Sequence, residues 1–323
     1  MKTSSATKQN SFAEDVSKGL ASNPKSLSSK YFYDDEGSRL FQQIMDLPEY
    51  YLTRAEFEIF KTQTKEIYAA FTARNLSFDL IELGAGDGTK TAILIEYFLR
   101  QNADFTYSPI DISREAVDIL TEKFTSDFPD LQINAKTGDY FRILETLKNE
   151  SKRPKILLFL GSNIGNFSSA ASIEFFRQLR EVMNTGDLLF VGFDLQKDPR
   201  IILKAYNDTQ GVTAEFNLNL LRRINRELGA NFKLGDFSHY AIYSPVECAA
   251  RSFLISRERQ SVRIESLDQD FEFAQWEPIF MEISHKYSLE MIADLAQTSG
   301  FEIEQNFFDS QKYFVDSLWK VSK

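Results

Sequence analysis

Apolar residues change their spacing along the chain, and these changes predict its elements. In the first part they recur every three or four positions, which predicts helices over about 11–20, 37–47 and 53–71. Thr53 is the expected N-cap of the last helix, with Glu56 as its capping-box partner. Short apolar runs then alternate with helical spacing. They predict strands near 78–83, 105–111, 131–137, 155–160 and 187–195, with helices near 88–100, 113–127 and 169–184.

The pattern changes again after Asp194. Helical spacing returns over 198–206 and 212–228, followed by alternating apolar positions typical of antiparallel strands. These strands are expected at 240–243, 251–256, 261–266 and 280–284. A helix over about 288–299 then precedes two strands, 301–307 and 313–321, which we expect to close the first sheet as an antiparallel hairpin.

This order of elements predicts an α/β fold with two discontinuous domains. Strands alternating with helices are typical of a parallel, Rossmann-like sheet with helices on both faces. We assign this sheet to residues 57–196 and 286–323, and a second, α+β domain to residues 1–56 and 197–285. A chain of 323 residues is long enough for two domains.

The first predicted strand runs into three glycines, Gly84, Gly86 and Gly88, and then into a helix. Strand, glycine turn and helix form the opening unit of a nucleotide-binding α/β sheet. The glycine spacing, with Glu82 on the strand, fits S-adenosylmethionine (SAM) methyltransferases better than dinucleotide dehydrogenases. A plain strand-to-helix turn is the alternative.

Ligands of open parallel sheets bind beyond the carboxyl ends of the strands, so the residues there are candidates. Asp111 ends the second strand, where a carboxylate can accept hydrogen bonds from two ribose hydroxyls; the alternative is a helix cap. Asp139 and Tyr140 follow the third strand. An acid and an aromatic ring suit an adenine, although for Asp139 on its own an exposed turn is the better interpretation.

The fourth strand is followed by two glycines and two asparagines between Gly161 and Asn166. Neutral amides and bare backbone there suit a polar substrate beside the sulfonium, whereas turn chemistry alone is the alternative. Lys90 lies in the first turn of a helix, where a cation opposes the helix dipole. It makes better sense facing the carboxylate of a methionine moiety than as a solvated surface lysine.

Glu282 and Ser284 lie two residues apart on a predicted strand and therefore share a face. Together they can bind a ring that bears two N–H groups, such as an imidazole. Without further evidence, the solvent face of an amphipathic strand is the better interpretation.

Composition narrows the possible partners. A net charge of −10 argues against non-specific binding to nucleic acid or to an anionic membrane surface. A single cysteine excludes an internal disulfide framework and a cysteine-cluster metal site, and only two histidines argue against a histidine-rich metal site. The N-terminal part has no long apolar run, so we expect neither a signal peptide nor a membrane helix, and a cytoplasmic location.

Several motifs together resemble the histidine Nα-methyltransferases of the ergothioneine pathway, over nearly the whole chain. The motifs that carry this resemblance are Pro24–Leu27, Tyr31–Asp34, Leu47–Tyr51, Thr53–Glu56, Glu82–Gly84, Phe159–Ser162, Ile164–Asn166, Ala205–Tyr206, Gly211–Thr213, Asn225–Leu228 and Glu282–Ser284. The resemblance implies a SAM-binding methyltransferase domain joined to a discontinuous substrate-binding domain. It also implies methylation of L-histidine to the trimethylated product, hercynine, by a monomer.

The resemblance further implies residue roles. Those expected to bind SAM are Gly84, Lys90, Asp111, Asp139 and Tyr140. Asn166 and Tyr206 match residues that hold the substrate carboxylate, so the substrate is expected to hold the two domains together. Those around the imidazole are Tyr50, Glu282 and Ser284, and Tyr33 matches a tyrosine close to the reacting amine. Tyr33 and Asn166 are the expected catalytic residues.

One departure from the family pattern leaves the substrate open. Ser252 occupies a position where a methionine packs over the imidazole in other members. Another aromatic amino acid, such as tryptophan, is therefore an alternative substrate. A SAM-binding protein without turnover and a nicotinamide-dependent oxidoreductase are the alternatives from other classes.

Overall fold

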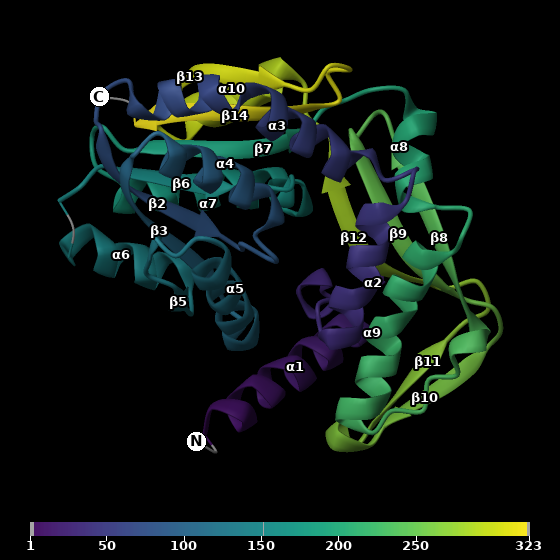
Figure 1. Ribbon diagram of the computed structural model, residues 1–323. Coiled ribbons are helices and arrows are strands. Elements are labelled where there is room, and N and C mark those ends of the chain that lie inside the picture. The colour runs from purple at the N-terminus through teal and green to yellow at the C-terminus, as the bar shows by residue number, and fades with distance from the viewer. Residues whose placement is uncertain (1–2, 151, 322–323) are drawn as a thin grey trace. The chain divides into compact units, whose positions relative to one another are not determined.

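The computed structural model describes residues 3–150 and 152–321, which form two compact units. The small-sheet unit comprises residues up to Tyr51 together with Lys197–His285, and the large-sheet unit comprises Leu52–Gln196 together with residues from Lys286 onward. Each unit thus combines two separate stretches of chain, as the colours in Figure 1 show. The division falls after Tyr51, so the predicted boundary at residue 56 would assign Leu52–Glu56 to the other unit.

The large-sheet unit contains a mixed sheet in the order β13-β14-β7-β6-β2-β3-β4, with β5 also paired to β3. Its core strands are parallel, whereas β14 is antiparallel to both β7 and β13. The predicted closing hairpin is therefore confirmed. The strands are β2 (Ser77–Leu83), β3 (Asp104–Asp111), β4 (Gln132–Ile133), β5 (Lys136–Thr137), β6 (Lys155–Phe159), β7 (Leu188–Asp194), β13 (Phe301–Phe308) and β14 (Phe314–Val321).

Helices cover both faces of this sheet, as the alternating pattern predicts. The buried side chains form two clusters: one includes Phe176 and Trp319, and the other includes Phe98 and Phe124. The helices α6 (Tyr140–Glu150), α7 (Ser169–Val182) and α10 (Leu289–Thr298) contribute to the first cluster. The helices α3 (Tyr51–Thr72), α4 (Thr89–Arg100) and α5 (Arg114–Asp127) contribute to the second. The fold is the predicted Rossmann-like α/β arrangement.

The small-sheet unit is α+β. Its sheet has the order β1-β12-β9-β8, and β10 and β11 form a separate hairpin. The strands are β1 (Lys25–Ser26), β8 (Phe237–Ser244), β9 (Ala249–Ser256), β10 (Gln260–Ile264), β11 (Gln269–Phe273) and β12 (Pro278–His285). The helices are α1 (Thr3–Ala21), α2 (Asp35–Asp46), α8 (Pro199–Tyr206) and α9 (Val212–Leu228). One core cluster includes residues of α1, α2, α9 and the strands β8 to β12, with Phe32 and Leu221 fully buried in it.

Some expectations were wrong in detail. The strand expected at 131–137 is split into β4 and β5, because Pro109 of the adjacent β3 has no N–H to offer the ladder. Helix α6, strand β11 and the short β1 were not predicted. Thr53 is not an N-cap, since α3 begins two residues earlier, at Tyr51. Glu56, its expected capping partner, bonds instead to Lys90 and to the Gly161 N–H.

Within the described residues, no helix combines the length and the apolar character needed to cross a membrane.

Candidate active site

The glycine turn links the end of β2 to the start of α4 within the large-sheet unit. Gly88 has a φ of 65°, and a Cβ there would come within 2.4 Å of Leu120 on α5, so both backbone and packing require glycine. Gly86 has a φ of 57°, and a Cβ there would meet nothing within 4 Å. Open space beside bare backbone at a helix N-terminus suits the anionic and polar parts of SAM.

Glu82 lies on β2 just before this turn, but it is not free to bind a ligand. Its carboxylate accepts hydrogen bonds from the Thr91 hydroxyl at 2.8 Å and from the Tyr107 hydroxyl at 2.5 Å. Burial raises its pKa to about 7 despite these two bonds. Glu82 therefore ties β2 to α4 and β3.

Three of the predicted SAM-binding residues lie together at the strand ends. The Tyr140 hydroxyl lies 3.1 Å from the position that a Cβ on Gly84 would occupy. Burial, and then the charge of Asp111, raise the pKa of Tyr140 to about 12, so it remains a neutral donor. Asp111 does not cap α5: that role belongs to Ser113, whose hydroxyl accepts from Ala116 N–H. Burial raises the pKa of Asp111, although its carboxylate accepts a hydrogen bond from the Ser113 N–H at 2.8 Å.

Asp139 has a structural role that the sequence left open. One of its oxygens accepts a hydrogen bond from Arg142 N–H at 3.1 Å and so caps the start of α6. This cap, followed by apolar residues at Ile143, Leu144 and Leu147, is the signal that would have predicted the helix. Its role toward an adenine stays a prediction.

Lys90 is not a solvated surface lysine. It forms an ion pair with Glu56, whose side chain is 1% exposed. Despite the loss of hydration, the Glu56 charge raises the pKa of Lys90. Its ammonium nitrogen also lies 3.5 Å from where a Cβ on Gly161 would be. Glu56 thus joins α3, α4 and the turn after β6, where Asn166 ends the 3₁₀ helix Asn163–Asn166.

In the small-sheet unit, four predicted substrate residues lie close together. Glu282 on β12 pairs directly with Ser252 on β9, and Ser284 pairs with Ala250, so Glu282, Ser252 and Ser284 share one sheet face. The Tyr206 hydroxyl donates to the Ser284 hydroxyl at 2.8 Å. Ser252 is 1% exposed, and its hydroxyl has no hydrogen-bond partner among the described residues.

The two predicted substrate tyrosines belong to one aromatic row in the same unit. Tyr33 and Tyr50 both pack edge-on against Phe41, with ring centroids 5.4 and 6.2 Å away. Glu282 and Tyr206 act electrostatically on the Tyr33 hydroxyl. The five substrate-binding residues predicted for this unit and the predicted catalytic residue Tyr33 therefore belong to one connected neighbourhood.

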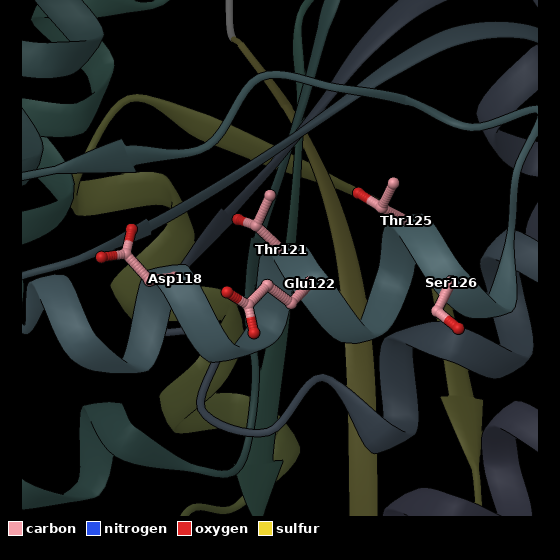
Figure 2. A pocket seen from close by; sticks show the side chains of 5 residues that line it. All are labelled: Asp118, Thr121, Glu122, Thr125 and Ser126. Atoms are coloured by element: carbon pink, nitrogen blue, oxygen red, sulfur yellow. The ribbon is translucent and has the colours of Figure 1, made fainter.

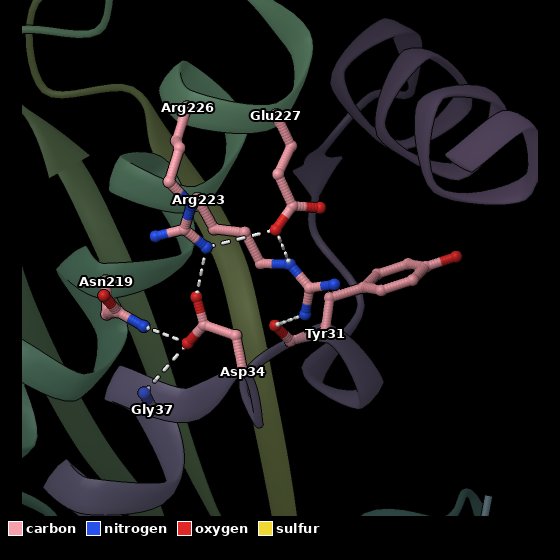
Figure 3. Close-up of polar contacts among 7 residues, drawn as sticks. All are labelled: Tyr31, Asp34, Gly37, Asn219, Arg223, Arg226 and Glu227. Atoms are coloured by element: carbon pink, nitrogen blue, oxygen red, sulfur yellow. Dashed lines mark hydrogen bonds and ion pairs between the residues drawn. The ribbon is translucent and has the colours of Figure 1, made fainter. Parts of the chain in front are cut away.

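A polar network, absent from the sequence-based prediction, holds the segment next to Tyr33 (Figure 3). The Asp34 carboxylate accepts hydrogen bonds from Gly37 N–H, Asn219 and Arg226, the last two on α9. Arg223 also donates to the Tyr31 carbonyl. These contacts fix both sides of Tyr33 against one helix. The repeated aromatic and acidic residues at 31–34 were the available signal.

A depression on α5 and the possible metal ligands are the other candidates for a site among the described residues. Figure 2 shows a shallow depression lined only by α5 side chains: Asp118, Thr121, Glu122, Thr125 and Ser126. These belong to the exposed side of one helix and include none of the predicted site residues. No group of three or more histidine, cysteine, aspartate or glutamate residues within the described ranges could hold a metal ion.

Comparison with known proteins identifies the family. A family model described as "Histidine-specific methyltransferase, SAM-dependent" matches residues 12–321. Histidine N-alpha-methyltransferase of Mycolicibacterium smegmatis is 38% identical over 284 residues, covering 88% of this chain and 87% of that protein. The protein of that name from Mycobacterium tuberculosis is 37% identical, covering 87% and 86%.

A longer relative shares the same region. Ergothioneine biosynthesis protein 1 of Schizosaccharomyces pombe is 26% identical over 287 residues, which cover 87% of this chain and 37% of that protein. The glycine turn, the strand-end residues and the match over nearly the whole sequence agree with each other. The chain belongs to the family of SAM-dependent, histidine-specific methyltransferases.

Proposed function

We propose that the protein methylates the α-amino group of free L-histidine up to three times and yields hercynine for ergothioneine biosynthesis. The observation that carries this proposal is the arrangement of Glu282 and Ser284 on one face of β12, beside the Tyr206 hydroxyl. An anion and a hydroxyl on one face match the N–H and the bare nitrogen of a neutral imidazole.

The large-sheet unit would hold SAM. We assign its contacts to Gly84, Lys90, Asp111, Asp139 and Tyr140, and the open space at Gly86 supports this assignment. When bound, SAM supplies an electrophilic methyl group on a sulfonium. The work left to the protein is to position the amine and exclude water.

The amino acid would be held mainly by the small-sheet unit. We assign the imidazole to Tyr50, Glu282 and Ser284, and the carboxylate to Tyr206 together with Asn166 of the large-sheet unit. The Tyr206 hydroxyl already donates its hydrogen to Ser284, so it must rotate before it can donate to a carboxylate. Ser284 can then donate to or accept from the imidazole.

The reacting amine must be neutral. The α-amino group of a free amino acid is largely protonated in solution at neutral pH. We propose that Tyr33 and Asn166 orient the amine once it has lost this proton. We propose that the Tyr33 hydroxyl, on which Glu282 and Tyr206 act electrostatically, takes part in the release of this proton.

Mass spectrometry of histidine incubated with the protein and SAM tests the proposal. Mass gains of one, two and three methyl groups are expected. Unchanged histidine, with SAM bound tightly in calorimetry, would instead support a binding protein without turnover. Histamine lacks the carboxylate and should be a poor substrate; equally fast methylation of histamine would contradict the roles given to Tyr206 and Asn166.

A second candidate substrate is tryptophan, and one observation favours it. Ser252 lies directly opposite Glu282 and is small, so it leaves more room than methionine for a bulkier ring. We nevertheless favour histidine, because an indole offers one N–H and no acceptor to the Glu282 and Ser284 pair. We also propose that the enzyme is cytoplasmic and acts as a monomer. Light scattering during gel filtration measures its molar mass in solution and so tests the monomer.

A further inference from the structure

Asp316 lies in the middle of β14 in the large-sheet unit and is 0% exposed. Neither of its carboxylate oxygens receives a hydrogen bond from any group in the described part of the chain. An ionised carboxylate without donors is costly in an apolar interior. Such a group is expected to retain its proton instead.

The group beside Asp316 is a second carboxyl, that of Glu56 on α3. The backbone explains how they meet. Asp316 pairs with Gly192 on β7, and a Cβ on Gly192 would lie only 2.6 Å from Glu56 Oε1. The missing side chain at Gly192 thus leaves the space that the Glu56 carboxylate fills.

The two acids differ in the donors that reach them. Glu56 Oε1 accepts the Gly161 N–H at 2.8 Å, and Oε2 forms the ion pair with Lys90. Asp316 has no comparable donor. Two carboxyls this close share one proton, and it belongs on the acid whose charge is least compensated.

The surrounding charges agree with this assignment. Around Asp316 lie Glu56 from α3 and Lys90 from α4, and Glu82 from β2 also acts on Lys90. Burial, followed by the Glu56 charge, raises the pKa of Asp316 well above its usual value, and the Lys90 cation opposes this only in part.

We propose that Asp316 carries a buried proton and donates it to Glu56, so that Glu56 is the single anion that positions Lys90 for the carboxylate of SAM. Asp316 and Glu56 are positioning residues on this view. The assignment of Lys90 to SAM rests on the proposed function, whereas the protonation of Asp316 does not. Ionising Asp316 at high pH would place a second negative charge beside Glu56 and compete for Lys90.

Infrared spectroscopy of the ligand-free protein tests the proton directly. The difference spectrum between wild type and Asp316→Asn at pH 8 should show loss of a protonated carboxyl C=O band. Asp118→Asn, at an exposed aspartate on α5, is the control and should show loss of an ionised carboxylate band. An ionised band for Asp316 as well would overturn the proposal.

Calorimetry with SAM tests the positioning role. Asp316→Asn keeps a neutral donor and should bind SAM as wild type does at neutral pH. The affinity of the wild type for SAM should fall at high pH, whereas that of Asp316→Asn should not. Glu56→Gln removes the anion and should weaken SAM binding about tenfold or more. If Asp316→Asn weakens SAM binding as much as Glu56→Gln does, the assignment of the proton to Asp316 is wrong.

The outcomes separate this inference from the proposed function. Wild-type protein that binds SAM but leaves histidine unchanged would contradict the proposed function and leave the inference intact. If Glu56→Gln does not fold, the infrared comparison of wild type with Asp316→Asn still decides where the proton lies.

Discussion

Asp111 was a candidate both for binding SAM and for capping helix α5. Ser113 caps α5, so removing the Asp111 carboxylate should leave the helix in place. Asp111→Ala should weaken SAM binding about 10- to 150-fold, because hydrogen bonds to a charged group contribute roughly 1.5–3 kcal/mol. Calorimetry measures this, with Asp118→Ala as the exposed control. An unchanged dissociation constant would remove Asp111 from the site.

Ser252 and Glu282 together should set the choice of amino acid. Ser252→Met should increase the preference for histidine over tryptophan by filling the space opposite Glu282. Glu282→Ala should weaken the binding of histidine by about 1.5–3 kcal/mol, because a hydrogen bond to a charged group is lost. The preference for histidine over tryptophan should therefore become smaller. A competition assay with equal histidine and tryptophan measures both effects. Wild-type preference for tryptophan would overturn the histidine assignment and leave the family unchanged.

At the scale of elements, the Asp34 network couples helix α2 to α9 and holds Tyr33. Burial acts to raise the pKa of Asp34, but the bonds from Arg226, Gly37 and Asn219 outweigh it and lower the pKa. Asp34→Ala should therefore cost roughly 1–2 kcal/mol of stability through the lost helix cap. It should also raise the KM for histidine by loosening Tyr33.

The exposed neighbour Asp35 provides a matched control, because it lies in the same first turn of α2. Asp34→Ala should be less stable than Asp35→Ala in urea unfolding, and it should have a higher KM for histidine in steady-state kinetics. Equal stability and equal KM in the two variants would show that the network does not position Tyr33.

At the scale of the whole molecule, Glu82 should make stability depend on pH. Its pKa rises from 4.5 to about 7 on folding, so the folded chain binds more protons within that window. This contribution is fully present below the unfolded pKa and is lost as pH rises through the folded value. The loss should reach roughly 3 kcal/mol, at about 1.4 kcal/mol per pKa unit.

Urea unfolding at pH 5 and pH 8 measures this contribution. Glu82→Gln can accept from one of the Thr91 and Tyr107 hydroxyls and donate to the other, but it cannot titrate, so its stability should fall less over the same range. Parallel pH profiles for wild type and Glu82→Gln would show that Glu82 stays ionised throughout.

The sequence by itself determined the parts of the fold that depend on local pattern. Strands β2, β6 and β7 contain short apolar runs that are mostly buried, and these runs, alternating with helical segments, predicted the strands and the parallel sheet. Helix α9 was predicted at its observed bounds, Val212–Leu228. Gly86, Gly88 and Asp111 became candidates because strand ends are where such sheets bind ligands.

Only the tertiary structure decided which polar groups meet. Glu56 looked like a local capping residue, yet it bonds to Lys90 and Gly161, 34 and 105 positions further along. Asp316 is an acid within a mostly apolar strand, which the sequence shows. Its neighbour across the sheet, Gly192, could not be predicted from the sequence. Local pattern fixes which face of an element is buried; packing between distant segments fixes which buried charges are compensated.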